Sequence, residues 1–106
     1  MGIANTSSAA ALMSALTSFD VEQCVGRGTG ISDEQLQKKI ALIEQSLARV
    51  LMPKITAESF TTEQVLSVLA ELGGFEIVQM VSAILTSATA RVPVVIDGFI
   101  VSVAAL

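Results

Sequence analysis

The residues of this chain best suited to chemistry are those whose types and spacing suit the binding of an anion. The first eight residues read MGIANTSS, in which Gly2 precedes small polar residues that open a helical stretch. Free backbone N–H groups at a helix start, together with the side chains of Asn5 and Thr6, offer donors to a phosphate. An ordinary helix N-cap is the competing interpretation, and the residue types alone favour it.

A second candidate for anion binding is the segment Gly26-Arg27-Gly28-Thr29-Gly30. Three glycines in five positions predict a loop, because glycine adopts positive φ readily. The backbone N–H groups of such a loop can surround a phosphate. The segment lacks the GK[ST] ending of a P-loop and the GxGxxG spacing of a dinucleotide site. A flexible turn is therefore the alternative.

Two charged residues complete the candidates. Lys39 lies three positions after Leu36 and one before Ile40, so it borders an apolar helix stripe and can reach a phosphate from there. A surface lysine that lies along that stripe is the alternative. Asp97 and Gly98 follow an apolar β-branched run, at the place where ligands bind in open α/β sheets. A turn or cap acid explains Asp97 equally well.

Composition excludes several classes of function. Cys24 is the only cysteine and histidine is absent, so zinc sites, Ser-His-Asp triads and internal disulfides are excluded within these 106 residues. A net charge of −4 and only one adjacent basic pair, Lys38-Lys39, argue against nucleic-acid binding. No basic leader and no run of about 18 apolar residues is present, so we expect a cytoplasmic protein without membrane contact.

Helix signals are the clearest structural pattern. Asn5, Thr6 and Ser7 are good N-caps for a helix over 8–16. Ser32 with Gln35, and Thr61 with Gln64, form capping boxes that predict two further helix starts. A stripe of apolar residues follows the first box at helical spacing, and its members are Leu36, Ile40, Ile43, Leu47 and Val50. Residues 21–25 are ambiguous between strand and helix.

The last third of the chain predicts the fold class. Gly73-Gly74 ends one helix, and 75–90 is a nearly uncharged helix that we expect to be buried almost all round. Pro93 precedes Val94–Ile96, which has the composition of a buried strand. Because one strand cannot form a sheet, we predict one partial α/β domain over 1–106, with its other strands elsewhere. This domain would be Rossmann-like, mostly helical, with one or two short parallel strands.

Four motifs in order resemble one family. MGIANTSSAAAL, VGRGTGISDEQLQKKI, LGGFEIVQM and VPVVIDGF are together similar to the second half of the nicotinate-nucleotide–dimethylbenzimidazole phosphoribosyltransferases of cobalamin biosynthesis. The resemblance implies a Rossmann-like fold in a homodimer. It implies transfer of phosphoribose from nicotinate mononucleotide to dimethylbenzimidazole, giving α-ribazole phosphate, with inversion at the ribose carbon. A glutamate base serves the reaction, and neither a metal nor a cofactor is needed.

The resemblance assigns roles to particular residues. It implies that Gly2 meets the phosphate through its backbone and that Lys39 contacts the nucleotide. The remaining implied substrate-binding residues are Asn5, Thr6, Gly28, Asp97 and Gly98, and Met1 falls on the apolar wall near the benzimidazole. Metal ligands are not implied.

Departures from the family pattern limit what the chain is expected to do. Family members are several times longer, and their general-base glutamate lies beyond Leu106, so no catalytic residue is assigned in this chain. Val101 stands where family members often have a serine. We therefore expect a fragment that is inactive alone. The alternative is a non-catalytic helical oligomerisation module derived from the same fold, which the 52% apolar composition favours.

Overall fold

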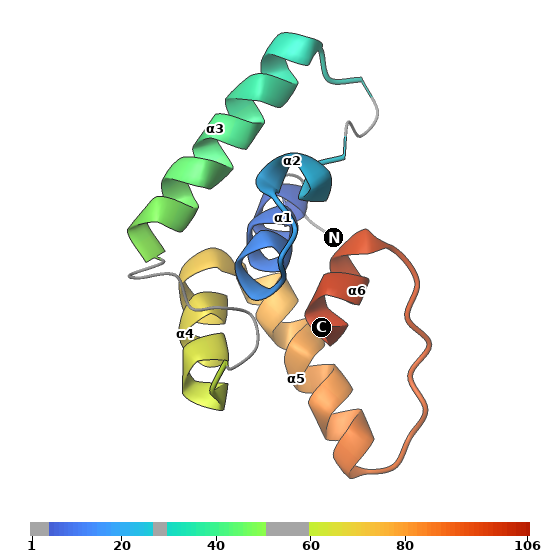
Figure 1. The fold of residues 1–106 in the computed structure, drawn as a ribbon. Coiled ribbons are helices and arrows are strands. Elements are labelled where there is room, and N and C mark those ends of the chain that lie inside the picture. Colours follow the sequence, from blue (N-terminus) through green and yellow to red (C-terminus); the bar gives the residue numbers. More distant parts are fainter. Residues whose placement is uncertain (1–4, 27–29, 51–59) are drawn as a thin grey trace.

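The structure is a computed structural model that describes residues 5–26, 30–50 and 60–106. Six α-helices occur in these ranges, and Figure 1 shows how they are arranged. They are α1 (Asn5–Leu16), α2 (Val21–Cys24), α3 (Asp33–Val50), α4 (Thr62–Leu72), α5 (Phe75–Thr89) and α6 (Phe99–Ala105).

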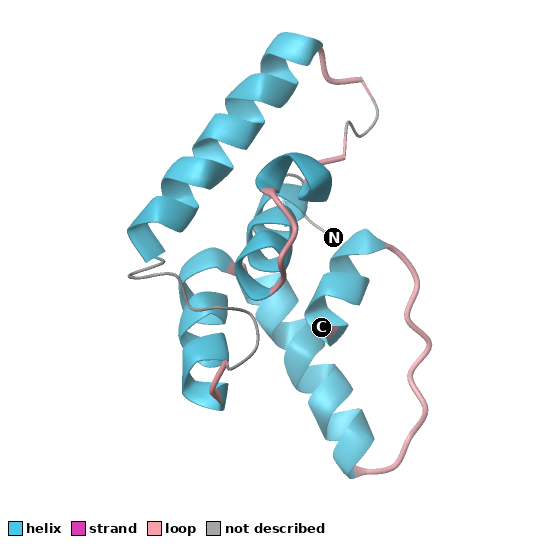
Figure 2. Ribbon diagram, viewed as in Figure 1, coloured by secondary structure: helices cyan, strands magenta, loops and turns pink. Residues whose placement is uncertain are grey.

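The predicted α/β class is wrong for the described residues, which contain no β-strand (Figure 2). Residues 92–97 form a loop that bows away from the helices between α5 and α6. Val95 in this loop is 91% exposed, although Val94–Ile96 was expected to be a buried strand. A strand requires a neighbouring strand to pair with its backbone, and β-branched composition cannot supply one. The expectation of a mostly helical chain is confirmed.

Helix starts follow the capping signals. The Ser32 backbone N–H donates to Gln35 Oε1 at 2.9 Å, and the Gln35 N–H donates to Ser32 Oγ at 3.3 Å. Thr61 and Gln64 form the same pair of bonds at the start of α4. Each box satisfies backbone donors that a helix N-terminus leaves unpaired, and both predicted boxes are confirmed.

Helix α1 lies at the centre of the described helices and contacts α2, α3, α4 and α6. Its small residues make this arrangement possible, because Ala9 and Ala10 are almost fully buried and permit close helix approach. The predicted stripe of α3 is confirmed: Ile40, Ile43 and Leu47 are buried in the core. Helix α1 is thereby packed against α3 along this buried stripe.

Helix α5 is much more exposed than its composition predicted. Ile77 is its one fully buried residue, whereas Phe75 is 89% and Leu85 is 61% exposed. The helix ends in a Schellman motif. The Arg91 N–H donates to Ala88 O, and the Val92 N–H donates to Ser87 O. Arg91 adopts φ 57° to close that turn. The expectation that α5 is buried almost all round is therefore wrong for the chain as described.

Candidate functional site

Two residues predicted to bind the anion are brought together by the fold. Lys39 Nζ donates a hydrogen bond to Thr6 Oγ1 at 3.2 Å, although the residues are 33 positions apart in sequence. Thr6 is the second residue of α1, and Lys39 lies in the second turn of α3. The ammonium group therefore lies next to the first turn of α1, where backbone N–H groups have no partner within the helix.

A cavity of about 430 Å³ adjoins this pair. Its lining comes from the start of α1, the end of α2, α3 and the start of α6, namely Thr6, Gln23, Cys24, Gly26, Lys39 and Phe99. The volume lies within the range of about 300–1,000 Å³ that is usual for small-molecule sites. Positive charge from Lys39 and from the N-terminal end of α1 suits it to an anionic group.

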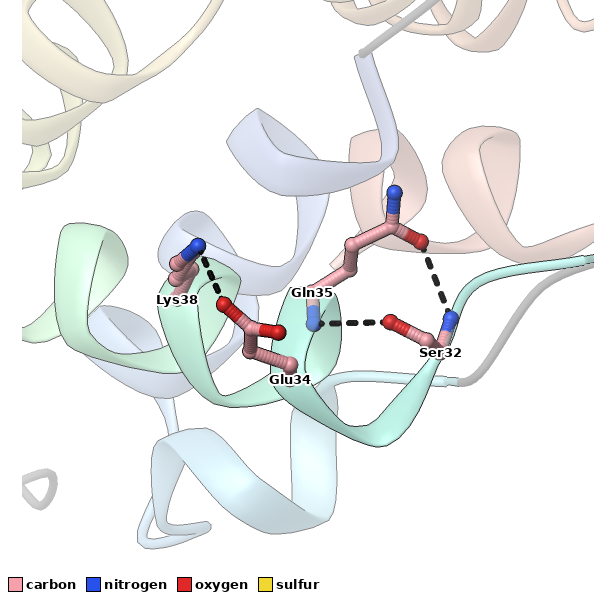
Figure 3. A network of polar contacts seen from close by, with 4 residues as sticks. All are labelled: Ser32, Glu34, Gln35 and Lys38. Atoms are coloured by element: carbon pink, nitrogen blue, oxygen red, sulfur yellow. Dashed lines mark hydrogen bonds and ion pairs between the residues drawn. The ribbon is translucent and has the colours of Figure 1, made fainter.

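The neighbouring lysine shows why Lys39 and not Lys38 belongs to this site. Lys38 Nζ forms an ion pair with Glu34 Oε1 at 2.6 Å on α3, beside the capping box of Ser32 and Gln35 (Figure 3). The Lys38 side chain is 73% exposed in this pair. Successive helix residues point about 100° apart, so one lysine reaches α1 while the other pairs along its own helix.

Asn5 has a different environment from the one predicted for a ligand-binding residue. It is the first residue of α1 and is 6% exposed, and it is absent from the cavity lining. Its Nδ2 is buried and has no hydrogen-bond partner in the described part of the chain. An unpaired buried amide costs free energy, so this donor is available to a group that approaches the start of α1.

The other predicted site residues are divided between exposed and undescribed positions. Asp97 is exposed and lies outside the cavity lining. Gly98 is the N-cap of α6, with φ 98° and ψ 160°, and it places the following Phe99 in the cavity wall. Met1, Gly2 and Gly28 lie outside the described residues.

Sequence reasoning missed Gln23 and Cys24 as lining residues. Both belong to α2, a four-residue helix in the segment that was ambiguous between helix and strand. Asp20 and Gln23 have the three-residue spacing of a capping box, which is the signal that would have identified the helix. Burial raises the pKa of the Cys24 thiol above its ordinary value, and the charge of Asp20 adds to this. The thiol of Cys24 is free and buried.

The chemistry available in this cavity is binding and charge neutralisation. The described lining includes no carboxylate or histidine, so no general base is present in that part of the wall. Among the residues placed by the structure, no group of three His, Cys, Asp or Glu is positioned to hold a metal ion. Within the same ranges, no helix has the length and apolar character needed to cross a bilayer.

Comparison with known proteins shows the family to which the chain belongs. A family model described as Phosphoribosyltransferase matches residues 1–106, and the chain belongs to this family. The particular relatives carry a more specific name. The chain is 52% identical over 105 residues to the nicotinate-nucleotide–dimethylbenzimidazole phosphoribosyltransferase of Vibrio vulnificus, covering 99% of this chain and 28% of that protein. The family resemblance predicted from four motifs is confirmed.

Two other relatives have the same name. The protein from Shewanella frigidimarina is 52% identical over 106 residues, covering all of this chain and 28% of its own length. The protein from Photobacterium profundum is 49% identical over 106 residues, covering all of this chain and 29% of its own length. The chain thus spans less than a third of these relatives. No solved structure matches it.

Proposed function

We propose that this chain forms the phosphate-binding part of the nicotinate mononucleotide site in a nicotinate-nucleotide–dimethylbenzimidazole phosphoribosyltransferase. The observation that carries the proposal is the 3.2 Å bond between Lys39 and Thr6 at the wall of a 430 Å³ cavity. The names of relatives about half identical to the chain support the substrate class. The anion would accept hydrogen bonds from Lys39 and from the first turn of α1.

The proposed reaction moves phosphoribose from nicotinate to dimethylbenzimidazole. The bond between the ribose anomeric carbon and the pyridine nitrogen breaks, and a bond from that carbon to a benzimidazole nitrogen forms. The proton on the attacking nitrogen's ring system must pass to a base, and we assign that role to no residue of this chain. The contribution of the chain is to hold the phosphate and so orient the ribose, which lowers the entropic part of the barrier.

Several of the remaining contacts stay predictions. We propose that Gly2, Asn5, Gly28, Asp97 and Gly98 complete the nucleotide contacts. Met1 would form part of the benzimidazole wall. Buried Asn5 Nδ2 is the best supported of these donors, because no residue that the structure describes accepts a hydrogen bond from it.

Calorimetric titration of nicotinate mononucleotide into the chain tests the binding proposal. We expect saturable binding that Lys39→Met weakens by about tenfold to a hundredfold, as loss of a charge-assisted hydrogen bond predicts. Lys38→Met is the matched control, since it removes the same charge from the next residue, where the ammonium pairs with Glu34. Equal effects of the two substitutions, or no binding by the folded chain, would refute the proposal.

We also propose that the chain is inactive alone. Incubation with nicotinate mononucleotide and dimethylbenzimidazole should give no α-ribazole phosphate by chromatography. Turnover by the chain at a rate proportional to its concentration would contradict this proposal, because it would require a base within these 106 residues.

A second candidate property is association into a homo-oligomer, and exposed apolar surface supports it. A groove of about 250 Å³ runs between α1, α4, α5 and α6. Leu66, Leu85 and Leu106 line it and are each more than half exposed. We propose that a second copy covers this face. Sedimentation equilibrium should show a dimer that Leu85→Lys dissociates, and a wild-type monomer at all concentrations would exclude the association.

We propose a cytoplasmic location as well. Its support is the free, buried thiol of Cys24, since proteins of oxidising compartments generally pair their cysteines. Fractionation of cells that make the chain would test this, and recovery outside the cytoplasm would contradict it.

A further inference from the structure

Three helices of this chain begin with the same arrangement, a glutamine at the third helical position that caps its own helix. Gln23, Gln35 and Gln64 each accept a hydrogen bond from the backbone N–H three residues earlier, at 2.9 Å in every case. Of the three, Gln23 alone lines the cavity that Thr6 and Lys39 adjoin. The same local motif therefore occurs once beside the candidate site and twice elsewhere.

The cap determines which end of the Gln23 amide is available. Oε1 accepts from the Asp20 N–H at 2.9 Å, so the amide oxygen is engaged in holding the start of α2. The capping bond leaves the Nε2 group and its two donors unused, and Gln23 is an exposed residue of the cavity wall. A glutamine whose oxygen is engaged in this way presents a donor, and not an acceptor, to whatever occupies the cavity.

The described cavity wall offers few hydrogen-bond donors to an anion. Its described lining contains Lys39 as the only charged group, with the hydroxyl of Thr6 accepting from it. An anion with several oxygens accepts more hydrogen bonds than one ammonium and one helix start provide, and the contacts proposed above for Gly2, Asn5 and Gly28 come from elements other than α2. A second neutral donor from α2 would meet that need from another element of the wall.

We propose that Gln23 is a further binding residue of this site, and that its Nε2 donates to an oxygen of the bound nucleotide. The inference rests on the proposed function, because it uses the same cavity and the same ligand. The capping bond preorganises the amide, so that the donor requires little reordering when the ligand binds. Gln23 thereby links the start of α2 to occupancy of the cavity.

Paired substitutions separate binding from capping. Gln23→Met and Gln64→Met both remove a capping acceptor without changing charge, so they should destabilise their helices similarly. Gln23→Met should also raise the Kd for nicotinate mononucleotide by about tenfold, while Gln64→Met leaves the Kd within about twofold of wild type. Gln23→Glu retains an oxygen for the Asp20 N–H but loses the donor. It should keep wild-type stability to urea and still bind at least as weakly as Gln23→Met.

Each outcome decides the inference. Weaker binding by both Gln23 variants, with stability retained by Gln23→Glu, supports a direct contact. Unchanged Kd in the Gln23 variants, together with weakened binding by Lys39→Met, would overturn the role of Gln23 and leave the proposed function standing. No binding by the folded wild-type chain would overturn both. Equal losses of affinity in Gln23→Met and Gln64→Met would show that capping alone matters and would also refute the contact.

Discussion

Substitution of Gly98 tests the backbone conformation at the start of α6 without changing the packing around it. It begins α6 with φ 98° and ψ 160°, a region that only glycine adopts readily. A Cβ built on Gly98 meets no heavy atom within 4 Å, so substitution by alanine produces no clash. The whole cost of Gly98→Ala is therefore backbone strain, which is about 1–3 kcal/mol for such conformations.

Gly26 is the matched control. A Cβ there also meets nothing within 4 Å, but the backbone lacks the positive φ that marks Gly98. Gly26→Ala should leave stability unchanged or raise it by up to about 1 kcal/mol, because alanine restricts the unfolded chain. The two substitutions add the same methyl group to equally open positions, so the difference between them measures the conformation alone.

Urea unfolding followed by circular dichroism is the assay. We expect the free energy of unfolding to fall by about 1–3 kcal/mol for Gly98→Ala and not for Gly26→Ala. For a domain of this size, that loss lowers the melting temperature by roughly 4 °C or more. Equal stability of the two variants would refute the conformation described for the start of α6, and with it the placement of Phe99 in the cavity wall.

Two further predictions concern the core and the thiol. Ile77→Ala should cost about 2–5 kcal/mol in urea unfolding because Ile77 is fully buried, whereas Phe75→Ala at an exposed position should stay within about 0.5 kcal/mol. Similar losses would contradict the burial of Ile77 and the exposure of Phe75 on α5. The pKa of Cys24 is raised in the folded chain, so its contribution to stability is complete below the ordinary value of 9.0 and is lost as the pH rises above it. Unfolding at pH 8 and pH 10 should show this extra loss in the wild type and not in Cys24→Ala, and equal pH dependence would contradict it.

Local signals in the sequence predicted the helices well. Ser32 with Gln35 and Thr61 with Gln64 fixed two helix starts, because a capping box depends only on residues within one turn. The same reasoning predicted the buried face of α3. It failed for Val94–Ile96, because a strand exists only beside another strand, and neither β-branched composition nor the neighbouring Pro93 reveals a partner.

The sequence predicted only those features of the site that depend on a single helix. Lys39 was singled out by its position at the edge of an apolar stripe, which is a local property of one helix. Its contact with Thr6 depends on how α1 packs against α3, and no spacing within either helix specifies that. Gln23 and Cys24 were missed as lining residues because they belong to a four-residue helix, too short for periodicity to identify.

The most direct test of the central claim is to locate nicotinate mononucleotide on the folded chain by amide chemical-shift changes. We expect shifts that saturate at the 430 Å³ cavity, with Thr6, Gly26 and Lys39 among the residues affected most. A separate cavity of about 210 Å³, lined in part by Arg49 and Glu71, serves as the internal control and should be unaffected. Saturable shifts centred on that second cavity, or none at Thr6 and Lys39, would contradict the assignment of the nucleotide site.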